Sequence, residues 1–331
     1  MKRWLGRALR LGLTAGCIAY VVRGTDFAAL GEAMLRMAPA AVAAALCAAC
    51  VDYMGMGARL MLVSGRRVGW LDAINASVLC NGLNVVLPAR MGEVAKVVHL
   101  RRRCGIPAGA GMGMVFWERF ADLNMLLFVA LAAAGASGQT LALAPVAIAA
   151  GGVWGALIVM RLFPAMQAVL LRLLIFERLR LFAAEVLGQL RERMTPGFLA
   201  VLALASLWPW TMHWVQHWLL LVWGAGLDLT PVQVLAIFVM SAGGLAVPSS
   251  PGNIGVYEAV MVAGLGLYGV PREEALAIAL VCHMTFQGPL ALYALGLMAF
   301  SGMEARELRD SAGAGPQTPN LPHALADRGK N

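Results

Sequence analysis

Charged residues are scarce in this sequence. Asp, Glu, Lys and Arg make up only 13% of the 331 residues, whereas 60% are hydrophobic. An ordinary soluble domain is about one quarter charged. The composition therefore excludes a soluble protein and predicts a chain that lies mostly within a bilayer. The longest polar stretch, 163–197, is too short to form a catalytic domain of its own.

Cysteines are few and scattered, and all but Cys104 lie in apolar segments where they pack as small hydrophobic residues. Cys47-x-x-Cys50 has redox spacing, but it lies among alanines without the strand and turn that a redox motif needs. We therefore predict no disulfide, no metal and no cofactor. The six cysteines are Cys17, Cys47, Cys50, Cys80, Cys104 and Cys282.

The N-terminal apolar run lacks the features of a cleaved signal peptide. It follows Met1-Lys2-Arg3, but Arg7 and Arg10 interrupt it, and no small-x-small pattern follows Val22. We interpret it as a spanning helix. Apolar runs that meet the requirement of about 20 residues for a bilayer lie at 4–22, 39–63, 109–136, 141–162, 198–223 and 274–300.

Two further apolar regions are interrupted by Pro and Gly near their middles. They are 71–100, broken at Pro88 to Gly92, and 231–268, broken at Pro248 to Gly255. Neither half is long enough to cross alone, and a broken backbone is tolerated in a membrane only inside protein or beside water. The predicted fold class is therefore an all-α polytopic membrane protein with about six spanning helices and two re-entrant helical hairpins.

Basic residues predict the orientation, because cytoplasmic loops accumulate Lys and Arg. Both termini are predicted to be cytoplasmic, and the two hairpins enter from opposite faces as an inverted repeat. The net charge of +8 follows from this topology and from headgroup attraction, so no nucleic acid is implied. The basic clusters that set the orientation are Lys2 and Arg3, Arg7 and Arg10, Arg66 and Arg67, Arg101 to Arg103, and Arg306 and Arg309.

Two polar segments complete the organisation. In 163–197, arginines alternate with glutamates, which is typical of a helix that lies on anionic headgroups. Residues 301–331 are rich in Gly, Pro and Ala and are predicted to be a disordered cytoplasmic tail. We therefore predict one transmembrane domain, 1–300, followed by that tail.

The second half of each hairpin begins near the membrane centre. Arg90 to Arg101 makes a helix of roughly 17 Å at 1.5 Å per residue, and the helix from Gly255 to Tyr268 has a similar length from the other face. Their N-terminal N–H groups and positive dipole ends therefore converge near the midplane. Such a place attracts an anion, above all a phosphate, and paired breaks of this kind are typical of transport sites.

Charged residues occur at the same depth. Glu118, Arg119 and Asp122 lie within the 109–136 run, where an unpaired charge costs about 2.5 to 3.5 kcal/mol or more. Glu118 and Asp122 share a helix face, and Arg119 can pair with Asp122 three residues later. Two interpretations stay open, a structural ion cluster that holds helices together and a role in substrate passage.

The acids and bases at the breaks also have two interpretations each. Glu93 and Glu258 are first-turn acids that satisfy a helix N terminus, or they bind a proton or a cationic headgroup. Arg90 and Lys96 are long enough to snorkel to the cytoplasm, although Arg90, beside the break, is the better candidate for phosphate contact. His283 either packs in the last span or pairs with the central acids.

His213 and His217 stand one helical turn apart, as metal ligands can, but the Glu that usually lies between such ligands is absent. We predict an aromatic interface instead. The surrounding tryptophans are Trp208, Trp210, Trp214, Trp218 and Trp223.

Three motifs follow one another along the chain. They are Asn84-x-x-Leu87-Pro88-x-Arg90-x-Gly92-Glu93, Glu118-Arg119-x-x-Asp122, and Pro251-Gly252-Asn253-Ile254-Gly255-x-x-Glu258. In this order they resemble the lysylphosphatidylglycerol synthase transmembrane family, also called flippase-like membrane proteins. The likeness covers roughly residues 1–300, although His283 stands where we expect Arg, which leaves the substrate open.

The resemblance implies a lipid translocase or lipid-transport protein of the bacterial inner membrane. Some family members carry a cytoplasmic aminoacyl-transferase domain; this sequence shows none, so no synthase activity is expected. The residues expected to bind substrate are Asn84, Arg90, Glu93, Glu118, Arg119, Asp122, Pro251, Gly252, Asn253, Gly255, Glu258 and His283.

The leading hypothesis is movement of an anionic phospholipid, aminoacylated or not, or of a lipid-linked glycan between leaflets. An alternative is a membrane-embedded lipid-modifying enzyme with Glu118 and Asp122 as acid and base, although no nucleophile, metal cluster or nucleotide loop accompanies them. Another is a non-transporting partner of a separately encoded lipid synthase. The sequence leaves open the lipid, the energy source and whether the chain forms a homo-oligomer.

Overall fold

A computed structural model describes residues 26–87, 90–137, 144–163, 171, 176–246 and 251–301. The regular elements in these ranges are all helical, which confirms the all-α fold class. The predicted first span at 4–22, the tail from 302 onward and the centres of both breaks, at 88–89 and 247–250, lie outside the described residues.

Five of the predicted spans are seen as helices. Within the described ranges, three stretches are long and apolar enough to cross a membrane, Pro39–Val63, Pro196–Gly224 and Arg272–Ala299. The number of spans beyond these three stays a prediction. The helices are α3 (Pro39–Val63), α6 (Ala108–Ser137), α7 (Ala144–Leu162), α10 (Pro196–Trp218), continued by the π-helix η2 (Leu219–Gly224), and α13 (Arg272–Ser301).

Both interrupted regions form pairs of half-helices. The first consists of α4 (Trp70–Val86) and α5 (Met91–Cys104). The second consists of α11 (Pro231–Ala246) and α12 (Val256–Gly266), with the short 3-10 turn η3 (Pro251–Asn253) between them. The predicted breaks are thus confirmed, whereas entry from opposite membrane faces stays a prediction.

The two breaks lie against each other. α4 contacts η3, and a Cβ built on Gly252 would lie only 3.3 Å from the carbonyl oxygen of Val85, near the end of α4. Gly252 also has φ 68°, a left-handed conformation that favours glycine. A larger residue there would push the breaks apart.

Two shorter helices lie at the periphery. Asp26 caps α2 (Phe27–Arg36), which we did not predict, by accepting from the N–H groups of Ala28 and Ala29 at 2.9 and 3.2 Å. α9 (Glu177–Arg193) lies in the polar segment. It packs on the start of α6, where the Gly109 N–H donates to Glu185 Oε2 at 3.1 Å. Contact between α9 and headgroups stays a prediction.

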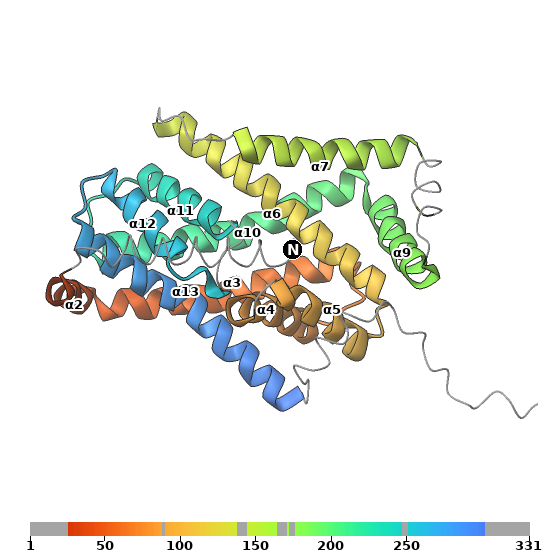
Figure 1. Ribbon diagram of the computed structural model, residues 1–331, viewed down its shortest axis with the longest axis horizontal. Coiled ribbons are helices and arrows are strands. Elements are labelled where there is room, and N and C mark those ends of the chain that lie inside the picture. The colour runs from red at the N-terminus through yellow and green to blue at the C-terminus, as the bar shows by residue number, and fades with distance from the viewer. Residues whose placement is uncertain are drawn as a thin grey trace, which may run out of the picture.

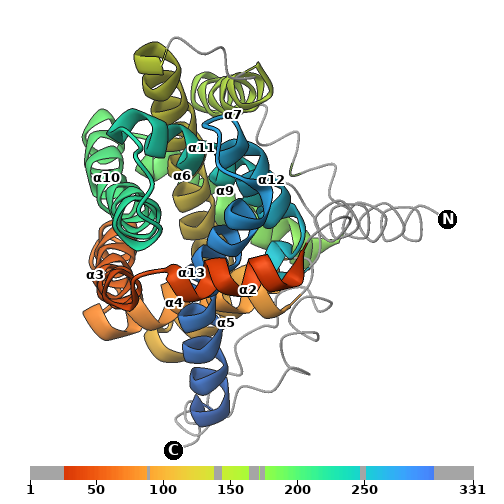
Figure 2. The same cartoon turned by 90° about the vertical axis from the view of Figure 1, so that its left-hand side faces the viewer.

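α6 runs diagonally through the molecule (Figure 1), with α7 on one side and α3, α4 and α5 on the other. The view turned by 90° keeps this order (Figure 2). α3 packs on α10 and α4, and α13 packs on α4 and α12. One apolar core contains Leu60, Leu100, Trp117 and Phe120. A second core lies around Ile237, Tyr257, Met261, Leu265 and Cys282.

Candidate functional site

Six charged side chains from three helices form what we call the charge network. α3 supplies Arg59, α5 supplies Glu93 and Lys96, and α6 supplies Glu118, Arg119 and Asp122. Of the two interpretations of the α6 charges, these contacts show the ion cluster, whereas a role in substrate passage stays a prediction.

The inner part of the network is buried. The side chains of Arg59, Lys96 and Glu118 are 7%, 2% and 3% exposed. Lys96 Nζ donates to Glu118 Oε2, and Arg59 Nε lies 4.0 Å from Glu118 Oε1. A buried charge without a partner is strongly destabilising. These pairs therefore hold α3, α5 and α6 together.

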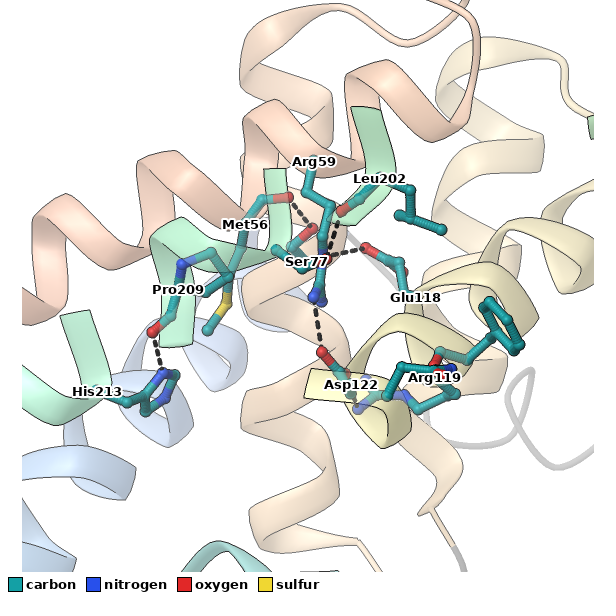
Figure 3. A network of polar contacts seen from close by, with 12 residues as sticks. Met56, Arg59, Ser77, Glu118, Arg119, Asp122, Leu202, Pro209 and His213 are labelled. Atoms are coloured by element: carbon teal, nitrogen blue, oxygen red, sulfur yellow. Dashed lines mark hydrogen bonds and ion pairs between the residues drawn. The ribbon is translucent and has the colours of Figure 1, made fainter. Parts of the chain in front are cut away.

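The outer part is more accessible. The side chains of Arg119, Asp122 and Glu93 are 34%, 26% and 22% exposed. Arg119 Nη1 lies 3.1 Å from Asp122 Oδ2, which confirms the predicted local pair, and Arg119 Nε lies 3.4 Å from Glu93 Oε1. Arg59 joins the two parts, since its Nη1 donates to Asp122 Oδ1 at 2.6 Å (Figure 3).

The charges at this site do not cancel. Three cations face three carboxylates in the network. Arg90 adds a fourth cation, with its Nη1 3.9 Å from Glu93 Oε1, so the sum is 4 − 3 = +1. The Arg90 side chain is 54% exposed. The accessible side chains sum to zero by themselves, so the excess positive charge comes from the buried Arg59, Lys96 and Glu118 behind them, and the whole group favours an anion.

Local backbone geometry at the first break depends on three residues of the predicted motif. The Gly92 N–H donates to Asn84 Oδ1 at 2.9 Å. A Cβ on Gly92 would lie 1.9 Å from the carbonyl oxygen of Cys80, so only glycine fits where α5 crosses α4. Arg90 has a left-handed backbone, with φ 55°, which costs a non-glycine residue about 1–2 kcal/mol.

A second polar cluster lies at the other break. Glu258 Oε2 accepts from the Gly255 N–H at 2.6 Å, and Glu258 Oε1 lies 2.5 Å from His283 Nδ1. His283 Nε2 lies 2.8 Å from the Gly252 carbonyl oxygen, which only accepts, so this nitrogen donates. The Tyr257 ring packs on the imidazole, with centroids 4.6 Å apart. This cluster is sealed, since Glu258 and His283 are 4% and 1% exposed.

These contacts decide several interpretations of the sequence. Glu258 accepts from the N–H of Gly255 at the start of α12, as predicted for an acid in the first turn of a helix. Glu93 instead faces Arg119 of another helix. His283 is buried against the ring of Tyr257 and pairs with Glu258 of α12, not with the acids of α6. The amides of Gly92 and Gly255 are bonded to side chains, so neither helix end presents all its N–H groups to an anion.

The predicted site residues thus fall into two groups. Glu93, Glu118, Arg119 and Asp122 lie together, with Arg90 at the edge. Asn84 supports the same break. The second group lies around η3 and consists of Gly252, Gly255, Glu258 and His283, with the backbones of Pro251 and Asn253.

One interpretation is wrong and one residue was missed. Lys96 does not snorkel to the cytoplasm, because α5 packs against α6 and directs the amine to Glu118.

Arg59 was missed, although a lone arginine near the end of the apolar run 39–63 is a recognisable sign of a buried ion partner. His213 and His217 lie against the ring of Phe238, and His217 also lies against Phe286. The aromatic interface formed by the five tryptophans stays a prediction. Among the described residues, no group of three or more side chains is placed to hold a metal.

The comparisons with known proteins fit this arrangement. A family model described as the lysylphosphatidylglycerol synthase TM region matches residues 7–292. The matched part contains both breaks, the charge network and His283, and it confirms the resemblance inferred from the three motifs. The comparison with curated proteins found no match.

Proposed function

The chain belongs to the lysylphosphatidylglycerol synthase transmembrane family, and on that premise we propose that it moves an anionic lipid between the leaflets of the bacterial inner membrane. Membership ties this helical membrane protein to lipid metabolism or transport. The proposed substrate is an anionic phospholipid, aminoacylated or not, or a lipid-linked glycan. The observation that carries the proposal is the partly exposed group of Arg90, Glu93, Arg119 and Asp122 at the first break, where Arg119 can exchange a carboxylate for a phosphate and the whole network with Arg90 sums to +1.

Arg119 is the residue best placed to hold a lipid phosphate. It is held between two carboxylates, Glu93 and Asp122. Its Nε has no hydrogen-bond partner among the described residues, although the atom is buried. A phosphate that displaces Glu93 can accept from Nε and from the guanidinium beside it, and such paired bonds to arginine are among the strongest in proteins.

Arg90 and Glu93 complete the proposed headgroup site. Arg90 offers a second cation to the phosphate at the exposed edge. Once displaced, Glu93 is free to pair with an amine, which is how an aminoacylated headgroup would be accommodated. The acyl chains stay in the surrounding lipid while the headgroup passes. The proposed topology, with both termini cytoplasmic, puts this site at the middle of the bilayer.

The test is leaflet exchange in liposomes that contain the purified chain and a labelled phosphatidylglycerol. The wild-type protein should accelerate exchange, and Arg119→Gln should slow it about 10- to 150-fold, the equivalent of a lost charged hydrogen bond of about 1.5–3 kcal/mol. Arg90→Ala should slow it as well. Arg36→Gln is the matched control, because Arg36 pairs only with its neighbour Glu32 on the surface of α2 among the described residues.

Folded Arg119→Gln and Arg90→Ala proteins that both exchange lipid at the wild-type rate would contradict the mechanism. Glu118→Gln is less useful as an activity test, since Glu118 is buried between Lys96 and Arg59 and its loss acts on folding first. The same contacts make Glu118 a poor general acid. The enzyme alternative therefore ranks second, and turnover of a lipid by the purified protein would reverse that order.

A further inference from the structure

A second buried acid lies outside the charge network. Asp52, on α3, is 1% exposed, and its Oδ1 has no hydrogen-bond partner among the described residues. Its other oxygen, Oδ2, lies 3.6 Å from Nε2 of His213 on α10. We call these two residues the Asp52–His213 pair. A buried carboxylate with a free oxygen inside a spanning helix is costly, and such residues commonly mark ion or proton paths.

The hydrogen bonds of His213 fix where a proton can bind. Its Nδ1 lies 2.6 Å from the carbonyl oxygen of Pro209 (Figure 3). A carbonyl oxygen only accepts, so Nδ1 carries a hydrogen and donates it. The nitrogen that faces Asp52 is therefore the one that gains or loses a proton. Without a proton there, a lone pair of Nε2 faces a buried carboxylate, and one proton placed between them removes that repulsion.

The pair leads from an accessible position to the charge network. The His213 side chain is 37% exposed, whereas that of Asp52 is 2% exposed. Arg59 lies seven residues after Asp52, two turns along the same helix face and roughly 10 Å away. The charged or titratable groups that act on Asp52 are His213 from α10, Arg59 from α3 and Asp122 from α6. Arg59 is bonded to Asp122, which pairs with Arg119.

We infer that the Asp52–His213 pair is a proton-binding site that couples proton movement to lipid movement, an inference that rests on the proposed function. His213 Nε2 takes a proton from a hydronium ion at its exposed edge, which leaves a water molecule. That N–H bond then breaks as an O–H bond forms at Asp52 Oδ2, which leaves a neutral imidazole and a neutral acid. The negative charge of Asp52 then no longer competes with Asp122 for Arg59, so the attraction between Arg59 and Asp122 becomes stronger. Asp122 then competes less for Arg119, which becomes available to a phosphate.

The experiment imposes a pH gradient on liposomes that contain the full chain and labelled phosphatidylglycerol. If one proton moves with each lipid, a gradient of one pH unit shifts the steady-state ratio between leaflets by up to about tenfold. Asp52→Asn should still exchange lipid but reach equal amounts in the two leaflets. Asp26→Asn is the matched control, because asparagine still caps α2, and it should accumulate lipid as the wild type does.

The outcomes separate this inference from the proposed function. No exchange by the wild-type protein, with or without a gradient, removes the proposed function. If the wild-type protein exchanges lipid but the ratio between leaflets does not change with the pH gradient, the coupling is wrong and the proposed function stands. An Asp52→Asn protein whose leaflet ratio still responds to the gradient also contradicts the coupling alone. If Asp52→Asn does not fold, His213→Gln takes its place, because it keeps the buried acid and removes its proton donor. A retained gradient response in His213→Gln overturns the inference.

Discussion

The two breaks follow the same sequence pattern, an apolar helix, a Pro and Gly interruption and then a glutamate, yet they differ in structure. At the first break, Glu93 is 22% exposed and faces Arg119, a cation of another helix. At the second, the Glu258 side chain is 5% exposed and is bonded to its own helix end and to His283. The first glutamate can exchange partners, whereas the second is enclosed.

Under the proposed function, this difference gives the two breaks separate tasks. The first break holds charges whose partners a phosphate can replace, so it suits a substrate. The second break satisfies its own polar groups and supports the first through the contact between Gly252 and Val85. The substrate-binding role predicted for Glu258 and His283 is therefore less favoured than a role in positioning η3.

The largest effect is expected inside the charge network. Lys96→Met leaves Glu118 buried with only the more distant Arg59 as a cationic partner, and removal of one partner of a buried pair costs about 3–5 kcal/mol. The variant should unfold at a much lower denaturant concentration than the wild type. Unfolding of the purified protein in detergent, followed by circular dichroism, measures the loss.

The double variant Lys96→Met with Glu118→Leu provides the matched control. It removes both buried charges, so its stability should recover most of what Lys96→Met alone loses. Arg59 remains paired with Asp122 in this protein. If the single variant is as stable as the wild type, Lys96 and Glu118 do not form the buried pair described above, and the first break has a different arrangement.

A moderate effect is expected at the second break. His283→Leu leaves Glu258 and the Gly252 carbonyl oxygen without this partner, which costs about 1.5–3 kcal/mol. Glu258→Gln should cost about 1 kcal/mol or less, because the amide can still accept from Gly255 and donate to His283.

Lipid exchange decides whether the breaks differ as proposed. Glu258→Gln should exchange lipid at nearly the wild-type rate, whereas Glu93→Gln should alter the rate because it changes the charge beside Arg119. A folded Glu258→Gln protein that no longer exchanges lipid would show that the second break also binds substrate or a proton, and the contrast between the breaks would be lost.

Helices and breaks were predictable because they depend on local composition. The run 39–63 has the bounds of α3, and 109–136 differs from α6 by one residue at each end. Long apolar runs have few alternatives in a membrane, and Pro and Gly mark where a helix must end. α2 was missed because its ten residues are too few to span a bilayer.

Partners across helices were harder to predict, because no local rule gives the direction of a side chain toward another helix. Lys96 lies close enough in sequence to the arginines at 101–103 to reach the cytoplasm, but packing of α5 on α6 turns it inward. Asp52 and Arg59 are isolated charges in an apolar run, and their partners come from α10 and α6. One sequence predicts how deep such a charge lies in the membrane, but it does not predict which residue of another helix pairs with it.

The smallest effect on stability is expected at Arg90, the residue that distinguishes the first break most directly. Arg90→Gly relieves a left-handed backbone that costs about 1–2 kcal/mol. It loses an exposed ion pair of about 0–1 kcal/mol, and the new glycine loses more backbone entropy on folding, at a cost of roughly 0.5–1 kcal/mol. The net change in stability should therefore be roughly 1 kcal/mol or less. Arg90→Ala keeps the strain and loses the pair, and it should be the less stable of the two. Both should slow lipid exchange alike, since both lack the guanidinium. Denaturant unfolding and exchange assays on the same preparations separate the two effects. Glycine would fit the backbone at position 90 better than arginine does, so the strain there suits a site that needs the guanidinium. If Arg90→Gly exchanges lipid at the wild-type rate, the guanidinium is not needed for exchange and the proposed role of Arg90 is wrong.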